Sequence, residues 1–561
     1  STFIPAVEVE FYLEISTLIW VLLFGHYLEA RSSSAAGNAL QEVAKLLPKT
    51  AHLLKDGEQS DVDVSSLKEG DTVLVKPGEK VPADGIITEG EASVDESLIS
   101  GESKPMSKKS GDGVVAGSIA LDGLLTVTLS RVGENSTIGQ IQKLITEAQK
   151  TKPRTQRIAD KASAILTFTA GIVALLTILV WSVILGEPFV FSMTLAITVL
   201  VIACPHALGL AIPTVTTITT SLAVKNGVFI KDLSKIEVIR KADYIVLDKT
   251  GTMTKGEFGV TNIVPITVSE EKEILQIAAS LGANASHVID FPIVKQAQKD
   301  GLILGKVSGF TSVGGRGILG EIDGKKYFLG NKAFVEENSK LGEKALDWYE
   351  KLSNKGETVI FLSNSQQVMG LISLADEIRD DSQSAIDQLH KLGLKVAMLT
   401  GDNEQVARGV AQSLGIDTYF AEVLPEDKYK YIKELQDKGS VVLMVGDGIN
   451  DAPALTQADA GIAIGAGTDI AIEAGDVVLT RNNPLDIPKM IKLAKVVYQK
   501  MIQNLVWALG YNIIAIPAAA GVFAVWGFFL RPEIGALVMS LSTVIVVINA
   551  LTLKKINLNV A

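Results

Sequence analysis

The chain has 561 residues, too many for one hydrophobic core, so its length predicts several domains. Hydrophobic residues make up 47% of the sequence and the mean hydropathy is +0.31, which is high for a water-soluble protein. The net charge of −11 argues against nucleic acid as a partner, because nucleic-acid binding needs a basic surface, and one cysteine leaves no internal disulfide.

Four stretches of the chain contain no Asp, Glu, Lys or Arg over a length that can cross a bilayer. Runs of roughly 20 residues without charge indicate membrane helices and argue against buried helices of a large soluble protein. The four stretches are residues 163–185, 189–213, 504–530 and 534–553.

A shorter charge-free run lies near the start of the chain, at residues 15–28, and we expect it to span together with its polar flanks. We assign residues 1–35 to this helix and a cytoplasmic extension. Residues 36–150 predict a small β-rich domain, because GLLTVTLSRV alternates as strands do, and KPGEK and PADG are typical of turns.

Residues 151–230 contain the next two predicted membrane helices, and the second includes Cys204, Pro205 and His206. Pro205 removes a backbone donor, so we expect it to disrupt the helix and expose carbonyl groups. Thiolate and imidazole both bind transition metals, and thiolate favours soft Cu(I). An ionisable residue inside a span is a functional hypothesis by default. We therefore predict a metal site here; a buried cysteine beside a hydrogen-bonded histidine is the alternative.

Residues 231–482 change to units of strand, loop and helix, which predict a doubly wound parallel α/β sheet. YIVLD, KVAMLTGDN and VVLMVGDGIND are typical of buried strands that end in polar loops, and RDDSQSAIDQLHKLG is typical of a helix. Hairpin signals such as GEIDGKKYFLG mark residues 259–371 as an α+β insertion. The insertion divides the α/β domain into residues 231–258 and 372–482.

Residues 483–561 contain the last two predicted spans, and both carry polar or soft side chains. A thioether is a soft metal ligand, and amide or hydroxyl groups can either bind an ion or pack helices together. For the serine and threonine residues we favour helix packing. The candidates to contact a transported ion are Tyr511, Asn512, Met539, Ser540, Ser542 and Thr543.

Lysine and arginine flank the two long soluble regions, which the positive-inside rule places in the cytoplasm. Five spans would then leave Ser1 on the outer side, with no export signal to carry it there. We therefore expect the natural protein to begin earlier, with further membrane helices. We expect its membrane to be a prokaryotic inner membrane.

Three of the predicted strands end in polar groups suited to phosphoryl transfer, namely DKTGT at residues 248–252, TGD at 400–402 and GDGIND at 446–451. The carboxyl ends of parallel strands meet at one edge of a sheet, where chemistry gathers. An aspartate there can attack phosphorus to form an acyl phosphate, and Mg²⁺ and a lysine can offset the repulsion between the two anions. We predict Asp248 as the nucleophile, Asp447 as a metal ligand, Thr400 as a phosphate ligand and Lys428 as the cation.

DKTGTMTKG, together with TGDN and MVGDGINDAPAL, resembles the P-type ATPases, and the resemblance covers essentially the whole chain. It implies that Mg-ATP phosphorylates Asp248 and that the phosphoenzyme drives a transport cycle. It also implies that Asp248, Thr250 through its backbone carbonyl, and Asp447 hold Mg²⁺, with Asp451 in the surrounding network. The other motif residues implied in catalysis or phosphate binding are Lys249, Thr400, Gly401, Asp402, Lys428 and Asn450.

The β-rich domain resembles the actuator domain of this family, with SGES at residues 100–103 where the family has TGES. The resemblance implies that Gly101 and Glu102 belong to the catalytic loop and that Glu102 positions the hydrolytic water. The insertion resembles the nucleotide-binding domain of heavy-metal pumps. The candidates for binding ATP there are His287, Gly315 and Gly317 on the adenine side, with Thr400 and Asp402 on the phosphate side.

The inserted domain departs from the family pattern at Gly282, Ser286 and Val288. Where it rejoins the α/β domain, Asp376 and Arg379 match a family hinge. A salt-bridged surface pair is the alternative interpretation of these two residues.

Cys-Pro-His, together with YN and MSLST in the last two spans, resembles the copper-exporting ATPase B branch, where CPH stands in place of the CPC of other copper pumps. This implies copper binding by Cys204 and His206. The sequence lacks the His-rich amino-terminal segment and the first membrane helices of that branch.

We predict a multidomain membrane protein that exports copper, as Cu⁺ or Cu²⁺, through a phospho-aspartate intermediate. Its cofactors would be ATP and Mg²⁺, its surroundings a lipid bilayer, and its partner a cytosolic copper donor. Zn²⁺, Cd²⁺ or Co²⁺ stays open as cargo. Two less favoured alternatives are a membrane-anchored phosphatase of the haloacid dehalogenase-like (HAD-like) type and a copper sensor or store without turnover.

Overall fold

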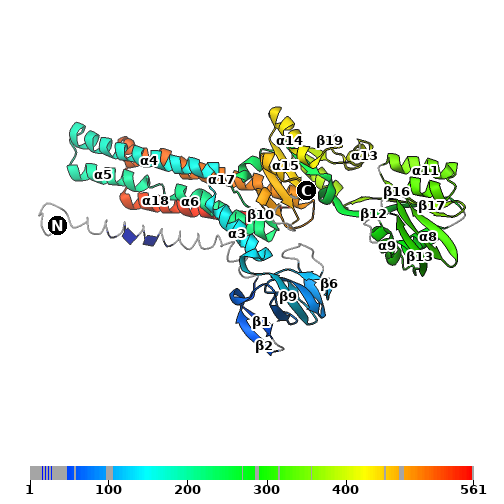
Figure 1. Cartoon of the computed structure of the whole chain (residues 1–561). Coiled ribbons are helices and arrows are strands. Elements are labelled where there is room, and N and C mark those ends of the chain that lie inside the picture. The colour runs from blue at the N-terminus through cyan, green and yellow to red at the C-terminus, as the bar shows by residue number, and fades with distance from the viewer. Residues whose placement is uncertain are drawn as a thin grey trace.

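The computed structural model describes six helical positions between residues 16 and 27 and most of the chain from residue 47 to residue 558. Figure 1 shows an elongated molecule, with a bundle of long helices at one end and three soluble bodies at the other. The described ranges are 47–55, 58–96, 105–267, 270–284, 290–313, 316–355, 357–402, 404–447, 450–465 and 473–558.

Within the described residues, four helical segments are long and apolar enough to cross a membrane. This confirms the four long spans predicted from charge-free runs; most of the run at 15–28 lies outside the described residues. Large apolar side chains such as Phe168, Leu175 and Ile513 are exposed on the helices, as expected for surfaces that face lipid. The helices are α4 (Arg154–Ile178), which a π-helical turn extends to Ile184, α5 (Phe189–Ile202) followed by α6 (His206–Lys225), α17 (Asp486–Ala519) and α18 (Pro532–Leu551).

The predicted span at residues 504–530 is wrong at its C-terminal end, because α17 stops at Ala519 and a separate 3₁₀ turn covers Val522–Trp526. Gly521 between them has a φ of 82°, which favours glycine. The indole of Trp181 donates a hydrogen bond of 3.0 Å to the carbonyl of Ala520 and so satisfies one of the last carbonyls of the helix.

The β-rich domain contains a six-stranded sheet in the order β2-β1-β3-β9-β4-β7 and a three-stranded sheet in the order β6-β5-β8. Asp84 is buried and accepts hydrogen bonds from the backbone N–H of Ala116 and Thr137, which fixes the helix α3 (Thr137–Lys150) to the sheet. The strands are β1 (Thr50–Lys55), β2 (Glu58–Asp63), β3 (Thr72–Val75), β4 (Asp84–Glu89), β5 (Glu91–Asp95), β6 (Met106–Lys109), β7 (Gly113–Val114), β8 (Ile119–Ala120) and β9 (Leu125–Arg131).

The α/β domain contains a seven-stranded sheet in the order β10-β22-β21-β20-β11-β18-β19, parallel except where β10 meets β22. The strands are β10 (Val228–Ile230), β11 (Tyr244–Asp248), β18 (Lys395–Leu399), β19 (Thr418–Phe420), β20 (Val442–Gly446), β21 (Ala460–Ile464) and β22 (Val477–Leu479), and the helices are α7 (Lys235–Ile239), α12 (Ser382–Lys391), α13 (Glu404–Leu414), α14 (Lys428–Asp437) and α15 (Ala452–Gln457). The predicted doubly wound sheet is confirmed. The first of the parallel strands along the chain, β11, lies between β18 and β20, so the strand order reverses beside it, where such sheets bind ligands.

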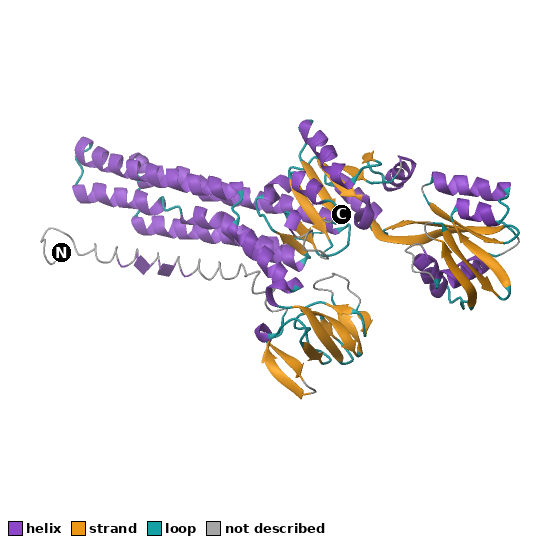
Figure 2. Ribbon diagram, viewed as in Figure 1, coloured by secondary structure: helices purple, strands orange, loops and turns teal. Residues whose placement is uncertain are grey.

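The inserted domain is an antiparallel sheet in the order β12-β17-β16-β15-β14-β13 with helices on both faces, as Figure 2 shows. Leu362 packs towards α8 and α9, and its neighbour Phe361 packs towards α10 and α11, because successive side chains of a strand point to opposite faces. The elements are β12 (Thr254–Pro265), α8 (Glu271–Gly282), α9 (Asp290–Lys299), β13 (Val307–Val313), β14 (Gly317–Ile322), β15 (Lys325–Gly330), α10 (Lys332–Asn338), α11 (Glu343–Asn354), β16 (Thr358–Asn364) and β17 (Val368–Ile378).

Strands β12 and β17 pair antiparallel along the junction between the inserted domain and the α/β domain. β12 begins before the expected boundary at 259, and β17 continues past the expected boundary at 371, because each strand runs through the junction without a break. The two chain crossings therefore form one two-stranded connection.

One hydrophobic core joins the membrane helices to the α/β domain. It includes Ile218 of α6, Ile236 of α7, Ile245 of β11 and Val497 of α17, all of which are buried. α17 has 34 residues, which at 1.5 Å per residue is roughly 50 Å, so it extends from the α/β domain far into the helix bundle.

Candidate functional site

Asp248 is the last residue of β11, and its side chain is 6% exposed. In the parallel register Asp248 lies beside Leu399 of β18, and Leu247 lies beside Val445 of β20. The loops that begin at Thr400 and at Gly446 therefore leave the sheet at the same edge as Asp248. The expectation that the three motifs meet at one edge is correct.

Lys428 connects two of the motif aspartates at this edge. Its ammonium donates hydrogen bonds of 2.6 Å to Asp248 Oδ1 and of 2.6 Å to Asp451 Oδ1. The other oxygen of Asp451 accepts a hydrogen bond of 3.2 Å from the backbone N–H of Asp447. The side chains of Lys428, Asp248 and Asp451 are all buried, so they form a buried network of charges rather than a surface salt bridge.

Burial and the neighbouring charge of Asp451 raise the pKa of Asp248 to about 7, although the Lys428 ammonium acts in the opposite direction. Burial also raises the pKa of Asp451. Burial lowers the pKa of Lys428, but Asp248 and Asp451 outweigh it, so the net shift is upward. The site thus holds more carboxylate charge than one lysine neutralises, which suits the binding of a further cation.

Lys249 and the TGD loop form a second part of the site. The Lys249 ammonium lies 2.5 Å from Asp402 Oδ2, and the Thr400 hydroxyl donates a hydrogen bond of 2.9 Å to the same oxygen. Thr400 is buried, whereas Gly401 and Thr250 are exposed. Thr400 and Lys249 therefore bind the same carboxylate, at the edge of the sheet where Asp248 lies.

Two glycines allow the loops to approach closely. Gly251, inside the DKTGT loop, has a φ of 74°, a conformation that favours glycine. At Gly446 a Cβ atom would lie 2.1 Å from Asp451 Oδ2, so a side chain there would collide with the carboxylate that Lys428 binds. The GDGIND motif thus needs glycine at this position for a steric reason.

The hinge residues predicted from the sequence bind the first of the two connecting strands. Asp376 Oδ2 accepts a hydrogen bond of 2.5 Å from the hydroxyl of Thr254, and the oxygen of that hydroxyl lies 3.1 Å from the carbonyl oxygen of Lys249. Arg379 Nε donates to the carbonyl of Thr254 at 2.9 Å. The two residues therefore connect the junction between the domains to the DKTGT loop that follows Asp248.

The oxygen ligands at this edge fit Mg²⁺, which prefers carboxylate and carbonyl oxygen. Asp447 is half-buried, and its negative charge contributes to the raised pKa of Asp248, so the two carboxylates are close. Among the described residues no group of three or more His, Cys, Asp or Glu side chains could hold a metal ion alone. Mg²⁺ usually binds one or two carboxylates together with waters and substrate phosphates.

Several predicted residues lie outside this network or outside the described residues. Asn450 is described and exposed. At Gly317 a Cβ atom would lie 2.5 Å from the Leu329 carbonyl and 2.6 Å from the Phe334 ring, so the glycine permits close packing of β14 and β15. The predicted residues that lie outside the described part of the chain are Gly101, Glu102, Ser286, His287, Val288 and Gly315.

In the membrane bundle, the helix is interrupted at the Cys-Pro-His segment. α5 ends at Ile202 and α6 begins at His206, so Cys204 and Pro205 lie in the break, as Pro205 predicts. Cys204 and His206 are both half-buried. The hydroxyl of Tyr511 on α17 donates a hydrogen bond of 3.4 Å to the carbonyl of Ile202, so α17 contacts the interrupted segment directly.

The other predicted ion-binding residues lie on the helices that pack against α6, namely α17 and α18. Asn512 and Ser542 are buried, and neither Asn512 Oδ1 nor Ser542 Oγ has a hydrogen-bond partner among the described residues. Burying a polar group without a partner costs about 1–3 kcal/mol, so such atoms call for a physical explanation. A bound ion or water would satisfy them.

The buried ion-binding candidates of α18 lie along one face of that helix. A Cβ at Gly535 would lie 3.8 Å from Ile202, the last residue of α5. Met539, Ser542 and Thr543 follow Gly535 by four, seven and eight positions, which puts them on the same side of the helix. All three are buried, and the Thr543 hydroxyl donates to the Met539 carbonyl at 3.4 Å, whereas Ser540 is half-buried.

The sequence did not predict a polar network that joins the three central helices. Asn504 of α17 donates a hydrogen bond of 3.0 Å to the carbonyl of Ala211 on α6, and Asn549 of α18 donates one of 2.8 Å to Asn504 Oδ1. Lys500 donates one of 2.8 Å to Asn549 Oδ1. The amide side chains in otherwise apolar spans could have predicted this network, because polar groups inside a membrane usually bind one another.

Comparison with known proteins agrees with this arrangement. Residues 45–146 match the P-type ATPase actuator domain, and residues 242–459 match the haloacid dehalogenase-like hydrolases. A solved structure described as a zinc-transporting PIB-type ATPase in the E2.Pi state aligns with 96% of this chain and 87% of its own, at a TM-score of 0.64 and 34% identity.

Curated relatives cover nearly the whole chain. The copper-exporting P-type ATPase B of Archaeoglobus fulgidus is 49% identical over 97% of this chain and 78% of its own length. A probable copper-transporting P-type ATPase B of Staphylococcus aureus is 42% identical over 97% of this chain and 81% of its own. The copper-exporting P-type ATPase B of Enterococcus hirae is 41% identical over 97% and 73%.

A HAD-like domain with an aspartate at its central strand end, an actuator domain and a membrane bundle together define an ATP-hydrolysing pump. The chain belongs to the heavy-metal-transporting P-type ATPases. It is therefore a multi-pass membrane protein that uses Mg-ATP to export a metal ion, and the phosphatase and sensor alternatives are set aside.

Proposed function

We propose that the chain exports copper from the cytoplasm, across a prokaryotic inner membrane, through a phospho-aspartate at Asp248 and an intramembrane site at Cys204 and His206. The observation that carries this proposal is the break between α5 and α6, which places a thiol and an imidazole in the bundle beside α17. The relatives from Archaeoglobus, Staphylococcus and Enterococcus are named as copper-exporting or copper-transporting pumps, which supports copper as the cargo.

At the phosphorylation site, an Asp248 oxygen attacks the terminal phosphorus of ATP, ADP leaves, and an acyl phosphate forms. Lys428 supplies positive charge to Asp248 and holds Asp451 in place, while Thr400 and Lys249 orient the transferred phosphoryl group. Bound Mg²⁺ supplies charge neutralisation, and Asp248, the Thr250 carbonyl and Asp447 are the residues that would hold it. Gly401, Asp402 and Asn450 complete the phosphate-binding edge.

Residues outside the described part of the chain complete the cycle in this proposal. Glu102, next to Gly101, positions the water that hydrolyses the acyl phosphate. His287 and Gly315, with Gly317, bind the adenine side of ATP. These assignments follow from the family motifs.

In the membrane, Cys204 and His206 bind the cargo together with carbonyl groups that the break leaves without helical partners. The thioether of Met539 adds a second soft ligand from the facing helix. Asn512 Oδ1 and Ser542 Oγ, which have no hydrogen-bond partner in the described part of the chain, line the path together with Tyr511, Ser540 and Thr543. A cytosolic copper donor would deliver the ion.

Zinc is the second candidate cargo, because the aligned solved structure is described as zinc-transporting. A thiol with a thioether favours Cu(I), whereas Zn²⁺ is commonly held by thiolate, imidazole and carboxylate. We therefore favour copper.

The deciding experiment measures ATP hydrolysis and metal uptake by the purified protein in inside-out vesicles. Cu(I) with a reductant, Cu(II) and Zn²⁺ are compared. We expect copper to stimulate hydrolysis and to accumulate inside the vesicles. Cys204→Ala should keep ATP binding and lose the stimulation, and Asp248→Asn should lose both the hydroxylamine-labile phosphoenzyme and transport.

The matched control is Thr194→Ala, because the Thr194 hydroxyl binds the Val190 carbonyl of its own helix α5. This variant should transport copper like the parent protein. Copper stimulation that persists in Cys204→Ala would reject the membrane site. Stimulation and uptake with Zn²⁺ in place of copper would reject the cargo.

A further inference from the structure

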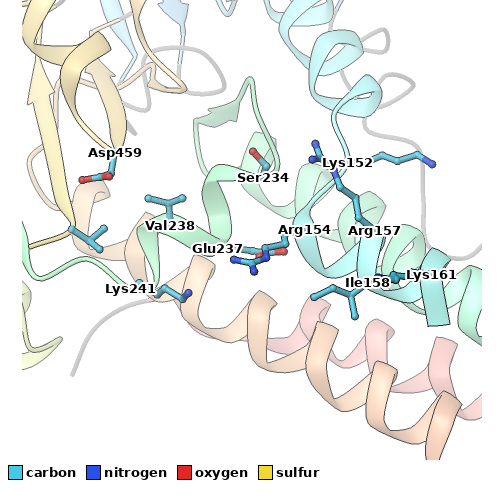
Figure 3. A pocket seen from close by; sticks show the side chains of 11 residues that line it. Lys152, Arg154, Arg157, Ile158, Lys161, Ser234, Glu237, Val238, Lys241 and Asp459 are labelled. Carbon is cyan, nitrogen blue, oxygen red and sulfur yellow. The ribbon is translucent and has the colours of Figure 1, made fainter. Parts of the chain in front are cut away.

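A basic cleft lies where the helix bundle meets the α/β domain, between the first turns of α4 and the short helix α7 (Figure 3). Its volume is about 670 Å³, within the range of small-molecule sites. Five cations and two carboxylates line it, so positive charge dominates. The cations are Lys152, Arg154, Arg157, Lys161 and Lys241.

The two carboxylates of the cleft already accept hydrogen bonds from neutral groups. Glu237 accepts hydrogen bonds from the backbone N–H of Thr155 at 2.7 Å and from its hydroxyl at 2.5 Å. Asp459 accepts from the backbone N–H of Val442 at 2.9 Å and from Gln436 at 3.0 Å. The contact between Glu237 and Thr155 fixes α4 to α7, so the two helices that form the walls of the cleft are bound to each other.

The cations, in contrast, are mostly available. Lys152 pairs with Asp160 at 3.2 Å in an exposed contact. Within the part of the chain that the structure describes, Arg154, Arg157, Lys161 and Lys241 form no ion pair. An arginine can bind two oxygens of a phosphate at once, so the cleft suits a phosphate group.

The cleft lies at the depth of lipid headgroups. Arg157 and Lys161 are one helical turn apart, about 6 Å along the axis, and the charge-free part of α4 begins directly after Lys161. From the cleft an apolar stripe continues along α4 at spacings of seven, three and four residues. Its members, all exposed, are Ile158, Ile165, Phe168 and Ile172.

We propose that this cleft binds the phosphate group of an anionic phospholipid of the cytoplasmic leaflet, with the acyl chains along the exposed apolar stripe of α4. The charge of the cleft selects the headgroup, and the stripe distinguishes a lipid from free phosphate. The lipid would contact the membrane helix and the α/β domain at once, because Arg157 lies on α4 and Lys241 follows α7.

The test measures retention of phosphatidylglycerol by the purified protein with native mass spectrometry, without ATP or copper, so it is independent of the pumping mechanism. The protein is reconstituted in nanodiscs of phosphatidylcholine with and without phosphatidylglycerol. We expect selective retention of phosphatidylglycerol. Each cation near a membrane surface contributes enough attraction that Arg157→Gln with Lys161→Gln should weaken retention about tenfold or more.

The matched control replaces Lys554 and Lys555, which follow α18 and do not line the cleft, by glutamine. Retention in this control should stay close to that of the parent protein. An equal loss in both double variants would mean general surface attraction and would overturn the proposal.

A second arm separates the lipid from free phosphate. Ile165→Ser with Phe168→Ser should weaken phosphatidylglycerol retention, while inorganic phosphate at equal concentration should not displace the lipid. Retention that is insensitive to these changes and is displaced by inorganic phosphate would identify a free-anion site and would overturn the proposal.

Discussion

Lys428 supplies the positive charge that faces two aspartates of the proposed phosphorylation site. Asp248 and Asp451 are both buried, and each is 2.6 Å from the same ammonium. A buried carboxylate that loses its cation is left with a desolvation penalty that nothing offsets. The same lysine therefore stabilises the fold and prepares Asp248 for its chemistry.

Replacing Lys428 by glutamine should expose this double role. Loss of the charge leaves Asp451 unpaired, so we expect the free energy of unfolding to fall by on the order of 3 kcal/mol. We also expect the rate of phosphoenzyme formation to fall at least 100-fold, because a charge aimed at the reacting oxygens is lost. Thermal unfolding and radiolabelled phosphorylation measure the two effects.

Lys438→Gln is the control for this variant. Lys438 follows the same helix, α14, but its pair with Glu434 is exposed. Its replacement should change neither unfolding nor phosphorylation measurably. A Lys428→Gln protein as stable as the parent would contradict the view that this lysine compensates two buried charges.

Among the elements, the paired strands β12 and β17 determine how the inserted domain can approach Asp248. They are the two crossings between the domains, and Thr254, Asp376 and Arg379 connect them to the DKTGT loop. A connection of this kind can bend as a unit, since domain closure is usually absorbed by a few residues at element ends. Its contacts should therefore govern the reaction with ATP more than the chemistry at phosphorus.

Arg379→Gln tests this role of the hinge. The variant loses the bond from Arg379 Nε to the Thr254 carbonyl. We expect phosphorylation by ATP to fall about tenfold, because the inserted domain is positioned less well. Phosphorylation by inorganic phosphate, which needs no nucleotide, should stay within about twofold of the parent protein on the same argument.

The comparison variant is Arg408→Gln, which removes an exposed pair with Glu404 on α13. Both phosphorylation reactions should be unchanged in it. If Arg379→Gln slows both reactions equally, Arg379 shapes the phosphate site itself and the hinge interpretation fails.

Across the whole molecule, one packed body joins the proposed phosphorylation site to the proposed metal site. β11, which carries Asp248, shares a hydrophobic core with α6 and α17, and α17 reaches the break at Cys204 through Tyr511. A packed core of this kind repacks between discrete arrangements rather than deforming gradually. Phosphorylation can therefore change metal affinity only by favouring one packing over another.

This coupling predicts that copper affinity depends on the state of Asp248. With Mg²⁺ and beryllium fluoride as a phosphate analogue, the parent protein should bind Cu(I) about 5- to 150-fold more weakly than without them. Asp248→Asn should bind Cu(I) with one unchanged affinity under both conditions. Competition with a chromophoric Cu(I) chelator under reducing conditions measures both.

Cys204→Ala serves as the reference for specific binding in this titration, since it removes the thiol at the break. An affinity in the parent protein that does not respond to the phosphate analogue would refute coupling through the shared core.

The sequence alone was sufficient for features that depend on local pattern. Charge-free runs predict the membrane helices because hydrocarbon excludes charge, and buried strands that end in polar loops predict the doubly wound sheet and its reactive edge. Pro205 predicts the break in the second span because it lacks a backbone donor. The resemblance to the P-type ATPases rested on short motifs that keep their order along the chain.

Only the tertiary structure decided which distant groups meet. Lys428 binds Asp248 from 180 positions away, and Asn504 reaches Ala211 on another helix. The end of α17 at Ala519 and the basic cleft between α4 and α7 likewise depend on packing between separate elements. Hydropathy and periodicity describe the structure that each segment prefers by itself. These contacts form only when folding brings two distant segments together, and neither segment's sequence alone specifies its partner.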